Sequence, residues 1–225
     1  MMGGGRTVVL VHGLWLGGWA LRRLAGRLQA QGHDRVLVYS WPTIRTGIDA
    51  NAQALRAYAD SVDSERIDWV GHSLGGVLIL RTLTHWSEAP PGRVVCLGSP
   101  LAGSRSAARL SRFGPGRRIA GRSIAEGVLG ESATTWCSPA LAARTGVIAG
   151  SQGVGAGRVL GHLDPPHDGT VRVAETRLPH IADHLVLPVS HTGLLFSRAV
   201  ATATDAFLRE GRFPDTPQER QQKRQ

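Results

Sequence analysis

One motif, at the junction of a short apolar run and a helical pattern, constrains this chain more than any other feature. The apolar run is 67–70, and the residues that follow it, 71–76, read GHSLGG. They fit the pattern G-x-S-x-G, in which a sharp strand-to-helix turn exposes a serine hydroxyl. A serine hydroxyl is a weak nucleophile and needs such presentation to react. Gly71 and Gly75 leave room for the strand and the helix to approach each other. The motif therefore predicts that Ser73 is a nucleophile rather than part of an ordinary glycine-rich turn.

Short apolar runs alternate with helix-length segments along the whole chain, and this alternation predicts the fold class. The runs are rich in branched apolar residues, which is typical of strands buried on both faces of a sheet. Strands that alternate with helices form βαβ units. We therefore expect an α/β fold with a mainly parallel sheet of about six strands and flanking helices. The predicted strands are 8–11, 36–39, 67–70, 94–97, 147–149 and 185–189, and the predicted helices are 21–28, 52–62, 74–83 and 194–207.

The length of 225 residues suits one compact domain with at most a small insertion. We expect that domain over 1–213, followed by a polar, flexible tail over 214–225. Residues 101–144 interrupt the alternation, because they hold no predicted strand and carry several arginines around a Gly-Pro-Gly sequence. They are predicted to be a small helical cap insertion whose arginines form a solvated helix face rather than a site for anionic ligands.

A second motif lies near the start of the chain. Residues 11–15 read VHGLW and come directly after the first predicted strand. With both motifs in place, the chain resembles the serine lipases and esterases of the α/β-hydrolase superfamily over residues 7–209. The resemblance implies an oxyanion hole made by the backbone N–H groups of Leu14 and Leu74, with Trp15 as the alternative to Leu14. His12 is expected to stabilise this loop rather than to take part in catalysis.

The resemblance also implies an acid that follows the serine in the chain and precedes the histidine. Asp168, in the sequence HDGTV after the fifth predicted strand, matches the acid position best. Asp164, which precedes two prolines, is the alternative. Aspartate next to glycine or proline also favours ordinary turns, so turn chemistry alone can explain either residue.

For the base, the resemblance points to the loop between the last predicted strand and the last predicted helix. His191 lies in that loop. His180 and His184 lie before or at the start of the same strand. Parallel strands carry their catalytic loops at the carboxyl ends, so His191 is the predicted base.

Composition excludes several classes of protein. With 42% hydrophobic and 19% charged residues, the chain is not largely disordered, and no apolar run reaches the roughly 18 residues of a membrane span. A net charge of +9 favours a nucleic-acid partner, but only one of the 26 basic residues is lysine, a skew typical of GC-rich coding. No recognised nucleic-acid motif accompanies the charge. We expect no nucleic-acid partner and no stable membrane insertion. Because the first residues lack the order of a signal peptide, we expect a cytoplasmic protein.

Metal binding and disulfide chemistry are not predicted. A cluster of histidine and aspartate lies at 162–168, and His180 and His184 have the spacing of a helical zinc pair. Neither group has further spacing evidence for a metal, so we expect no metal and no cofactor. Two cysteines do not make a disulfide framework, and Cys96 lies in an apolar run typical of a buried core thiol.

The predicted function is that of a serine hydrolase that cleaves a carboxylic ester, with a small-molecule acyl ester as substrate, through Ser73, His191, Asp168 and an acyl-enzyme. Leu14, Trp15, Leu16 and Trp19 are expected to line an acyl pocket or to pack beneath one. Thioester or amide cleavage by the same triad is an alternative, as is a catalytically silent protein of this fold that binds a ligand. The sequence predicts no particular oligomeric state.

Overall fold

Six parallel strands form the one sheet of this protein, whose computed structural model describes residues 5–86, 88–111, 114–153 and 163–215. The strand order is β2-β1-β3-β4-β5-β6, and each neighbouring pair is parallel. The predicted mainly parallel sheet of six strands is therefore confirmed. The strands are β1 (Arg6–Val11), β2 (Arg35–Tyr39), β3 (Arg66–His72), β4 (Val94–Leu97), β5 (Thr145–Gly150) and β6 (Asp183–Leu187).

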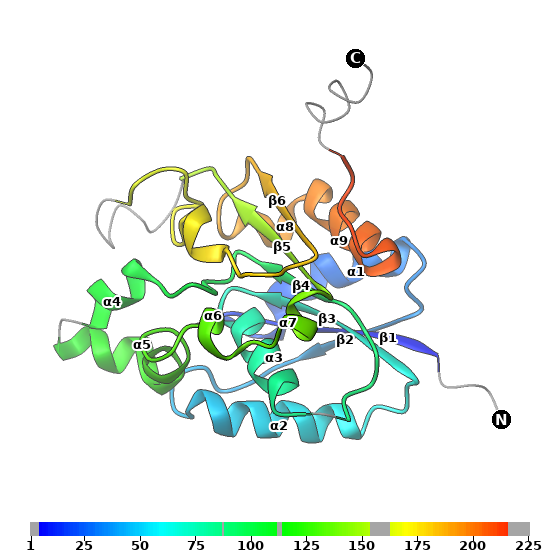
Figure 1. Ribbon diagram of the computed structural model, residues 1–225, viewed down its shortest axis with the longest axis horizontal. Coiled ribbons are helices and arrows are strands. Elements are labelled where there is room, and N and C mark those ends of the chain that lie inside the picture. The colour runs from blue at the N-terminus through cyan, green and yellow to red at the C-terminus, as the bar shows by residue number, and fades with distance from the viewer. Residues whose placement is uncertain (1–4, 87, 112–113, 154–162, 216–225) are drawn as a thin grey trace, which may run out of the picture.

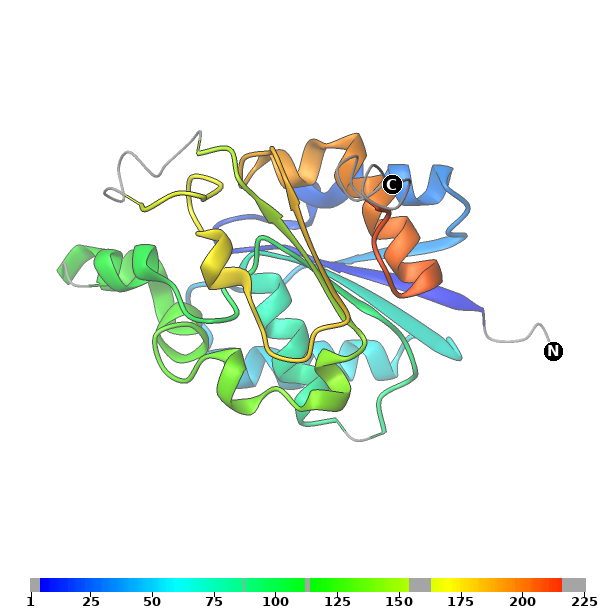
Figure 2. The ribbon, with the colours of Figure 1, turned by 45° about the horizontal axis from the view of Figure 1, so that its top comes forward.

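Helices cover both faces of the sheet (Figures 1 and 2). The face that carries α1 also carries α8 and α9, and the other carries α2 and α3. These helices are α1 (Arg22–Ala30), α2 (Ile48–Asp60), α3 (Leu74–Thr84), α8 (Gly193–Phe196) and α9 (Arg198–Glu210), and short 3-10 helices occupy Gly18–Leu21 and Val173–Thr176.

The two hydrophobic cores explain why the strands read as continuous apolar runs. Along β1, Val8 and Leu10 pack into the core beneath α1 and α9, while Val9 and Val11 pack into the core beneath α2 and α3. All four side chains have no solvent exposure. Because side chains alternate between faces and both faces are covered, all of positions 8–11 favour apolar residues.

Residues 101–144 supply further helices between β4 and β5. They are α4 (Arg105–Ser111), α5 (Gly114–Gly127), α6 (Ala133–Trp136) and α7 (Pro139–Ala142). Helix α5 is kinked at Gly121, whose φ of 76° and ψ of 176° are not helical. Buried residues of all four helices, such as Ile124 and Leu141, join the core on the α2 and α3 side. This group of helices therefore lies on one face of the sheet.

The predicted helix 194–207 is wrong in one respect, because the structure breaks it at Ser197. The backbone of Ser197 is extended, with φ −76° and ψ 133°, and its side chain accepts a hydrogen bond from the N–H of Val200 at 3.3 Å. A serine side chain can in this way cap the free N–H groups at the start of a helix, which favours a new helix start at that point. The result is two helices, α8 and α9, in place of one.

Of the predicted tail, 214–225, only residues 214 and 215 belong to the described part of the chain. None of the described helices combines the length and the apolar composition that a membrane crossing requires.

Candidate active site

The candidate site lies at the carboxyl edge of the sheet. Loops that follow β1, β3, β4, β5 and β6 all contribute residues to one pocket there. In a parallel sheet the carboxyl ends of all strands meet at the same edge, so residues far apart in sequence come together.

Ser73 lies between the last residue of β3 and the first residue of α3. Its φ of 53° and ψ of −123° are rare for any residue other than glycine. The N–H of Ser73 donates to the carbonyl of Leu97 in the neighbouring strand at 2.8 Å. The turn is therefore fastened to the sheet, with the serine at its tip.

Glycines on both sides of Ser73 allow this tight turn. A Cβ atom at Gly71 would lie 2.4 Å from the Cα atom of Gly76, and one at Gly75 would lie 2.3 Å from the carbonyl oxygen of Val11. No side chain fits in either place. Helix α3 can therefore approach both β3 and β1, which brings its N-terminal end to the site.

Asp168 and His191 form a direct contact. Asp168 Oδ2 lies 2.6 Å from His191 Nδ1, and the side chains are 1% and 14% exposed. The N–H of His191 also donates to the backbone carbonyl of Asp168 at 2.9 Å. The other carboxylate oxygen, Oδ1, accepts hydrogen bonds from the N–H groups of Thr170 and Val171 at 2.9 and 2.7 Å. The carboxylate is thus held in place by its own turn while it orients the imidazole.

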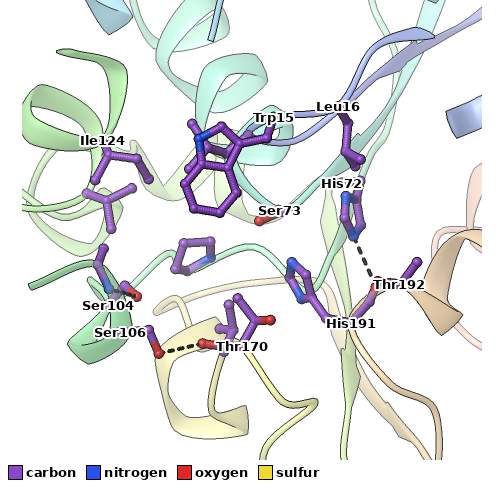
Figure 3. Close-up of a pocket in the computed structure, with 15 residues that line it drawn as sticks. Trp15, Leu16, His72, Ser73, Ser104, Ser106, Ile124, Thr170, His191 and Thr192 are labelled. Atoms are coloured by element: carbon purple, nitrogen blue, oxygen red, sulfur yellow. Dashed lines mark hydrogen bonds between the residues drawn. The ribbon is translucent and has the colours of Figure 1, made fainter. Parts of the chain in front are cut away.

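Ser73 and His191 both line a pocket of about 220 Å³, and Figure 3 shows how they lie. Within the described part of the chain, the Ser73 hydroxyl and the His191 ring do not form a hydrogen bond. Such contacts often tighten only when substrate is bound. The pocket is smaller than the roughly 300–1,000 Å³ typical of sites for larger ligands.

Apolar side chains form most of the pocket wall, and Figure 3 shows the Trp15 indole over the pocket. Trp15 is 51% exposed and has a φ of 58°, which is rare for a bulky residue. Trp19, which was expected in the same cluster, is 65% exposed and does not line the pocket. The apolar lining residues are Leu14, Trp15, Leu16, Pro100, Ala107, Ile124, Val128 and Val171.

The backbone N–H groups proposed for an oxyanion hole differ in their surroundings. Within the described part of the chain, no hydrogen bond occupies the N–H of Leu14 or of Leu74. The N–H of Trp15 points instead at the Thr43 hydroxyl, 3.4 Å away. Leu74 is the first residue of α3, where free N–H groups carry the positive end of the helix dipole.

Asp164, the alternative acid, lies elsewhere. Its carboxylate accepts hydrogen bonds from the guanidinium groups of Arg105 and Arg172, each at 3.2 Å, and its side chain is 64% exposed. Asp164 thus connects the start of α4 to the segment after Asp168, and it makes no contact with His191.

The other predicted histidines have structural contacts. Nδ1 of His12 donates to the carbonyl of Gly13 at 2.9 Å, and its Nε2 accepts from the N–H of Trp41 at 3.2 Å. Burial lowers the pKa of His12. His12 therefore stabilises its loop, as expected. His184 contacts the Thr176 hydroxyl at 2.9 Å, and neither it nor the exposed His180 lines the pocket.

In the part of the chain that the structure describes, metal-binding residues do not converge. Among the described residues, no group of three or more histidine, cysteine, aspartate or glutamate side chains could hold a metal ion. His162 of the predicted cluster lies outside those residues. Nδ1 of His167 accepts a hydrogen bond from the N–H of Gly169 at 3.0 Å. Cys96 and Cys137 are free, and burial raises the pKa of their thiols to about 12 and about 11. Neither thiol is therefore an activated nucleophile at neutral pH.

Two arginines of residues 101–144, Arg105 and Arg122, lie at the surface. The side chains of Arg105 and Arg122 are 63% and 72% exposed and pair with Asp164 and Glu126. Neither arginine lines the pocket. Both side chains are therefore solvated, while the expectation of a solvated helix face for the remaining arginines stays a prediction.

Two residues of the site were missed in the sequence. His72 was read only as the variable position of the motif, yet its ring lies against the ring of His191, with centroids 4.7 Å apart. Gly98 follows β4, and a Cβ atom there would lie 3.1 Å from Asp168 Oδ2 and 3.2 Å from His191 Nδ1. A glycine directly after a buried strand of a parallel sheet is a signal that could have indicated Gly98.

Comparisons with known proteins agree on the fold. A family model described as "Alpha/beta hydrolase family" matches residues 8–213. Among solved structures, the mature form of the lipase BlEst2 from Bacillus licheniformis superposes with a TM-score of 0.69 at 16% identity, over 93% of this chain and 92% of that one.

Two curated relatives carry the name esterase. The probable esterase PIR7A of Oryza sativa subsp. indica is 29% identical over 125 residues, which are 50% of this chain and 47% of the relative. The carbendazim hydrolyzing esterase of Nocardioides sp. (strain SG-4G) is 38% identical over 84 residues, which are 32% of this chain and 33% of the relative. The chain therefore matches less than half the length of each of these two relatives.

Proposed function

Because the chain belongs to the alpha/beta hydrolase family, we propose that it hydrolyses a carboxylic ester with Ser73 as nucleophile, His191 as base and Asp168 as orienting acid. The observation that carries this proposal is the 2.6 Å contact between Asp168 and His191, beside a strained serine in the same pocket. The esterase names of the matched relatives support the reaction class.

The reaction has two halves. Ser73 Oγ attacks the acyl carbonyl while His191 Nε2 takes the hydroxyl proton, and the same proton then passes to the leaving alkoxide. This releases the alcohol and leaves the acyl group on Ser73. Water, deprotonated by His191, then attacks the acyl-enzyme. The bond between Ser73 Oγ and the acyl carbon breaks, Ser73 Oγ takes the proton back from His191, and the acid is released. Asp168 keeps the proton of neutral His191 on Nδ1, so that Nε2 is free to accept the second proton, and stabilises the imidazolium that forms.

The negative charge of each tetrahedral intermediate needs hydrogen-bond donors that are already in place. We assign this role to the backbone N–H groups of Leu14 and Leu74. Support comes from their lack of a partner in the described part of the chain and from the place of Leu74 at the start of α3. The contact of the Trp15 N–H with Thr43 favours Leu14 over Trp15.

The substrate we propose is a small acyl ester. A pocket of about 220 Å³ with a mostly apolar wall suits a short acyl group. Residues 101–144 act as a small cap, because Ser104, Ser106, Ala107, Ile124 and Val128 border the pocket. An ester is favoured over an amide because an alkoxide is expelled more easily than an amine.

Hydrolysis of p-nitrophenyl esters from acetyl to palmitoyl tests this function. We expect turnover that is greatest for the short acyl chains and that is nearly abolished in the Ser73→Ala variant. Loss of the nucleophile from a comparable triad costs on the order of a million-fold in kcat. An inactive wild-type protein, or a Ser73→Ala variant that keeps more than a tenth of the activity, would refute the proposal.

A further inference from the structure

His72, the residue before Ser73, makes one directed polar contact. Its Nε2 lies 3.1 Å from the backbone carbonyl oxygen of His191. The contact joins the end of β3 to the loop after β6, and β4 and β5 lie between these strands in the sheet. Figure 3 shows it as a dashed line beside the pocket. The His72 side chain thus connects the end of β3, next to Ser73, with the loop that carries the base.

The chemistry of the contact defines the state of the His72 ring. A carbonyl oxygen can only accept, so Nε2 must carry the proton and donate it. The other nitrogen, Nδ1, is buried and has no hydrogen-bond partner in the described part of the chain. Burial lowers the pKa of His72 to about 3, so the ring is neutral at physiological pH. It can therefore lie against the His191 ring without placing a second cation beside the imidazolium that forms during catalysis.

His191 is held from two sides. Asp168 binds its ring at Nδ1 and its backbone N–H, while His72 binds its backbone carbonyl. Because His72 is covalently joined to Ser73, the path from the nucleophile to the base consists of one peptide unit, one imidazole and one hydrogen bond. Contacts of this kind fix catalytic groups within the fractions of an ångström that reaction requires.

We propose that His72 is a positioning residue, whose Nε2–H holds the main chain of His191 so that the imidazole of the base faces Ser73. This role rests on the proposed ester hydrolysis. It also differs from simple packing. If the ring only fills space, a phenyl ring of similar size serves equally well; if it positions the base, the donor at Nε2 is required.

Three substitutions separate these roles. His72→Phe keeps a ring but removes the donor. His72→Gln places an amide N–H near the reach of Nε2, whereas the amide of His72→Asn ends one bond earlier, near the place of Nδ1. We expect kcat on the best p-nitrophenyl ester to fall roughly ten- to a hundredfold in the Phe and Asn variants, with KM within about threefold of wild type. His72→Gln should keep at least a third of the wild-type kcat.

His33→Phe is the matched control. His33 is also a buried histidine, and its Nε2 lies 2.8 Å from Asp205 Oδ1, but it precedes β2 at the opposite edge of the sheet from the pocket. We expect this variant to lose stability in urea unfolding while its kcat stays at the wild-type value. It therefore shows whether lost stability alone lowers kcat. If His72→Phe does not fold, the kcat values of His72→Asn and His72→Gln are compared instead.

The outcomes distinguish the positioning role of His72 from the proposed ester hydrolysis on which it rests. Wild-type kcat in folded His72→Phe, or equal losses in the Gln and Asn variants, would overturn the positioning role and leave ester hydrolysis intact. A wild-type protein that hydrolyses no ester would overturn both.

Discussion

Asp168 contacts His191 with one carboxylate oxygen and closes its own turn with the other. Oδ2 lies 2.6 Å from Nδ1 of the imidazole, while Oδ1 accepts the N–H groups of Thr170 and Val171. The two oxygens are therefore not interchangeable, and the carboxylate cannot rotate without losing backbone contacts. In the proposed mechanism this arrangement lets Asp168 hold one tautomer of His191 and stabilise the imidazolium that forms.

Substitution of Asp168 by Asn is expected to remove most activity. If the amide oxygen keeps the contacts with Thr170 and Val171, the NH₂ group faces His191 Nδ1. That nitrogen must then accept, so the proton moves to Nε2, which can no longer take the serine proton. A wrong tautomer of this kind costs about 10⁴-fold in kcat. Ester turnover of the purified variant measures the loss.

Asp164→Asn is the matched control for that variant. Asp164 contacts Arg105 and Arg172 at an exposed position, where ion pairs contribute at most about 1 kcal/mol to stability. We expect it to keep at least a third of the wild-type turnover. Equal losses in the two variants would show that the acid has been assigned wrongly.

Gly98→Ala tests the space beside the same pair. The new methyl group would lie 2.6 Å from Leu194 Cδ1, 3.1 Å from Asp168 Oδ2 and 3.2 Å from His191 Nδ1. We expect kcat to fall at least roughly tenfold, because small displacements of catalytic groups are costly. Gly103→Ala is the control, since Gly103 also has a positive φ, 89°, but its nearest atom would lie 3.8 Å away. Both variants should lose about 1–2 kcal/mol of stability from left-handed backbone strain, and only Gly98→Ala should lose turnover.

Trp15→Ala is expected to change which acyl chains are accepted. The indole covers part of a pocket of about 220 Å³, and its removal enlarges that pocket. Alanine keeps a Cβ atom, so the unusual φ of 58° is no easier to adopt and only the indole is lost. We predict that kcat/KM for octanoyl relative to acetyl ester rises roughly tenfold. Trp19→Ala, which removes an exposed indole outside the pocket lining, should leave the chain-length profile unchanged; an equal shift there would exclude this role for Trp15.

The stability of the protein should fall in mild acid, in part through His72. Its pKa is about 3 in the folded protein and near 6.5 in the unfolded chain. Between these values the unfolded chain binds a proton that the folded protein excludes, so the free energy of unfolding decreases as the pH falls. Above pH 6.5 the full stability is present. From pH 7 to pH 5 this one group should cost about 2 kcal/mol. In urea unfolding, wild type should lose that much more than His72→Gln over this range; identical losses would contradict a buried neutral imidazole.

The central strands of the sheet were predictable because they are buried on both faces. A strand such as β4, with the sequence VVCL, is an apolar run whichever core each side chain faces, so it can be recognised without knowing which strands lie beside it. The break at Ser197 was not predictable in the same way. The apolar spacing of 194–207 continues across it, and a serine hydroxyl there can either face solvent or cap a new helix.

The residues of the candidate site also differ in how far the sequence predicts them. Ser73 carries a local signal, because a strand, a turn and a helix lie next to one another in sequence. The choice between Asp168 and Asp164 rested on a resemblance and on the residues that follow each aspartate. Neither pattern shows that Asp164 contacts two arginines, because Arg105 lies 59 residues away in the chain. The contact of His72 with His191 joins residues 119 positions apart, and no local sequence pattern around either histidine predicts it.

Covalent labelling of the full chain with a fluorophosphonate tests most directly whether Ser73 is the nucleophile. The reagent forms a phosphonyl ester with an activated serine, and Ser73 is the only serine between Arg66 and Arg81, so tryptic peptide 67–81 reports its labelling unambiguously. We predict one adduct, on that peptide, that is absent from Ser73→Ala and forms far more slowly in Asp168→Asn. An adduct on a different peptide, or labelling of Ser73→Ala at the wild-type rate, would contradict the assignment of Ser73.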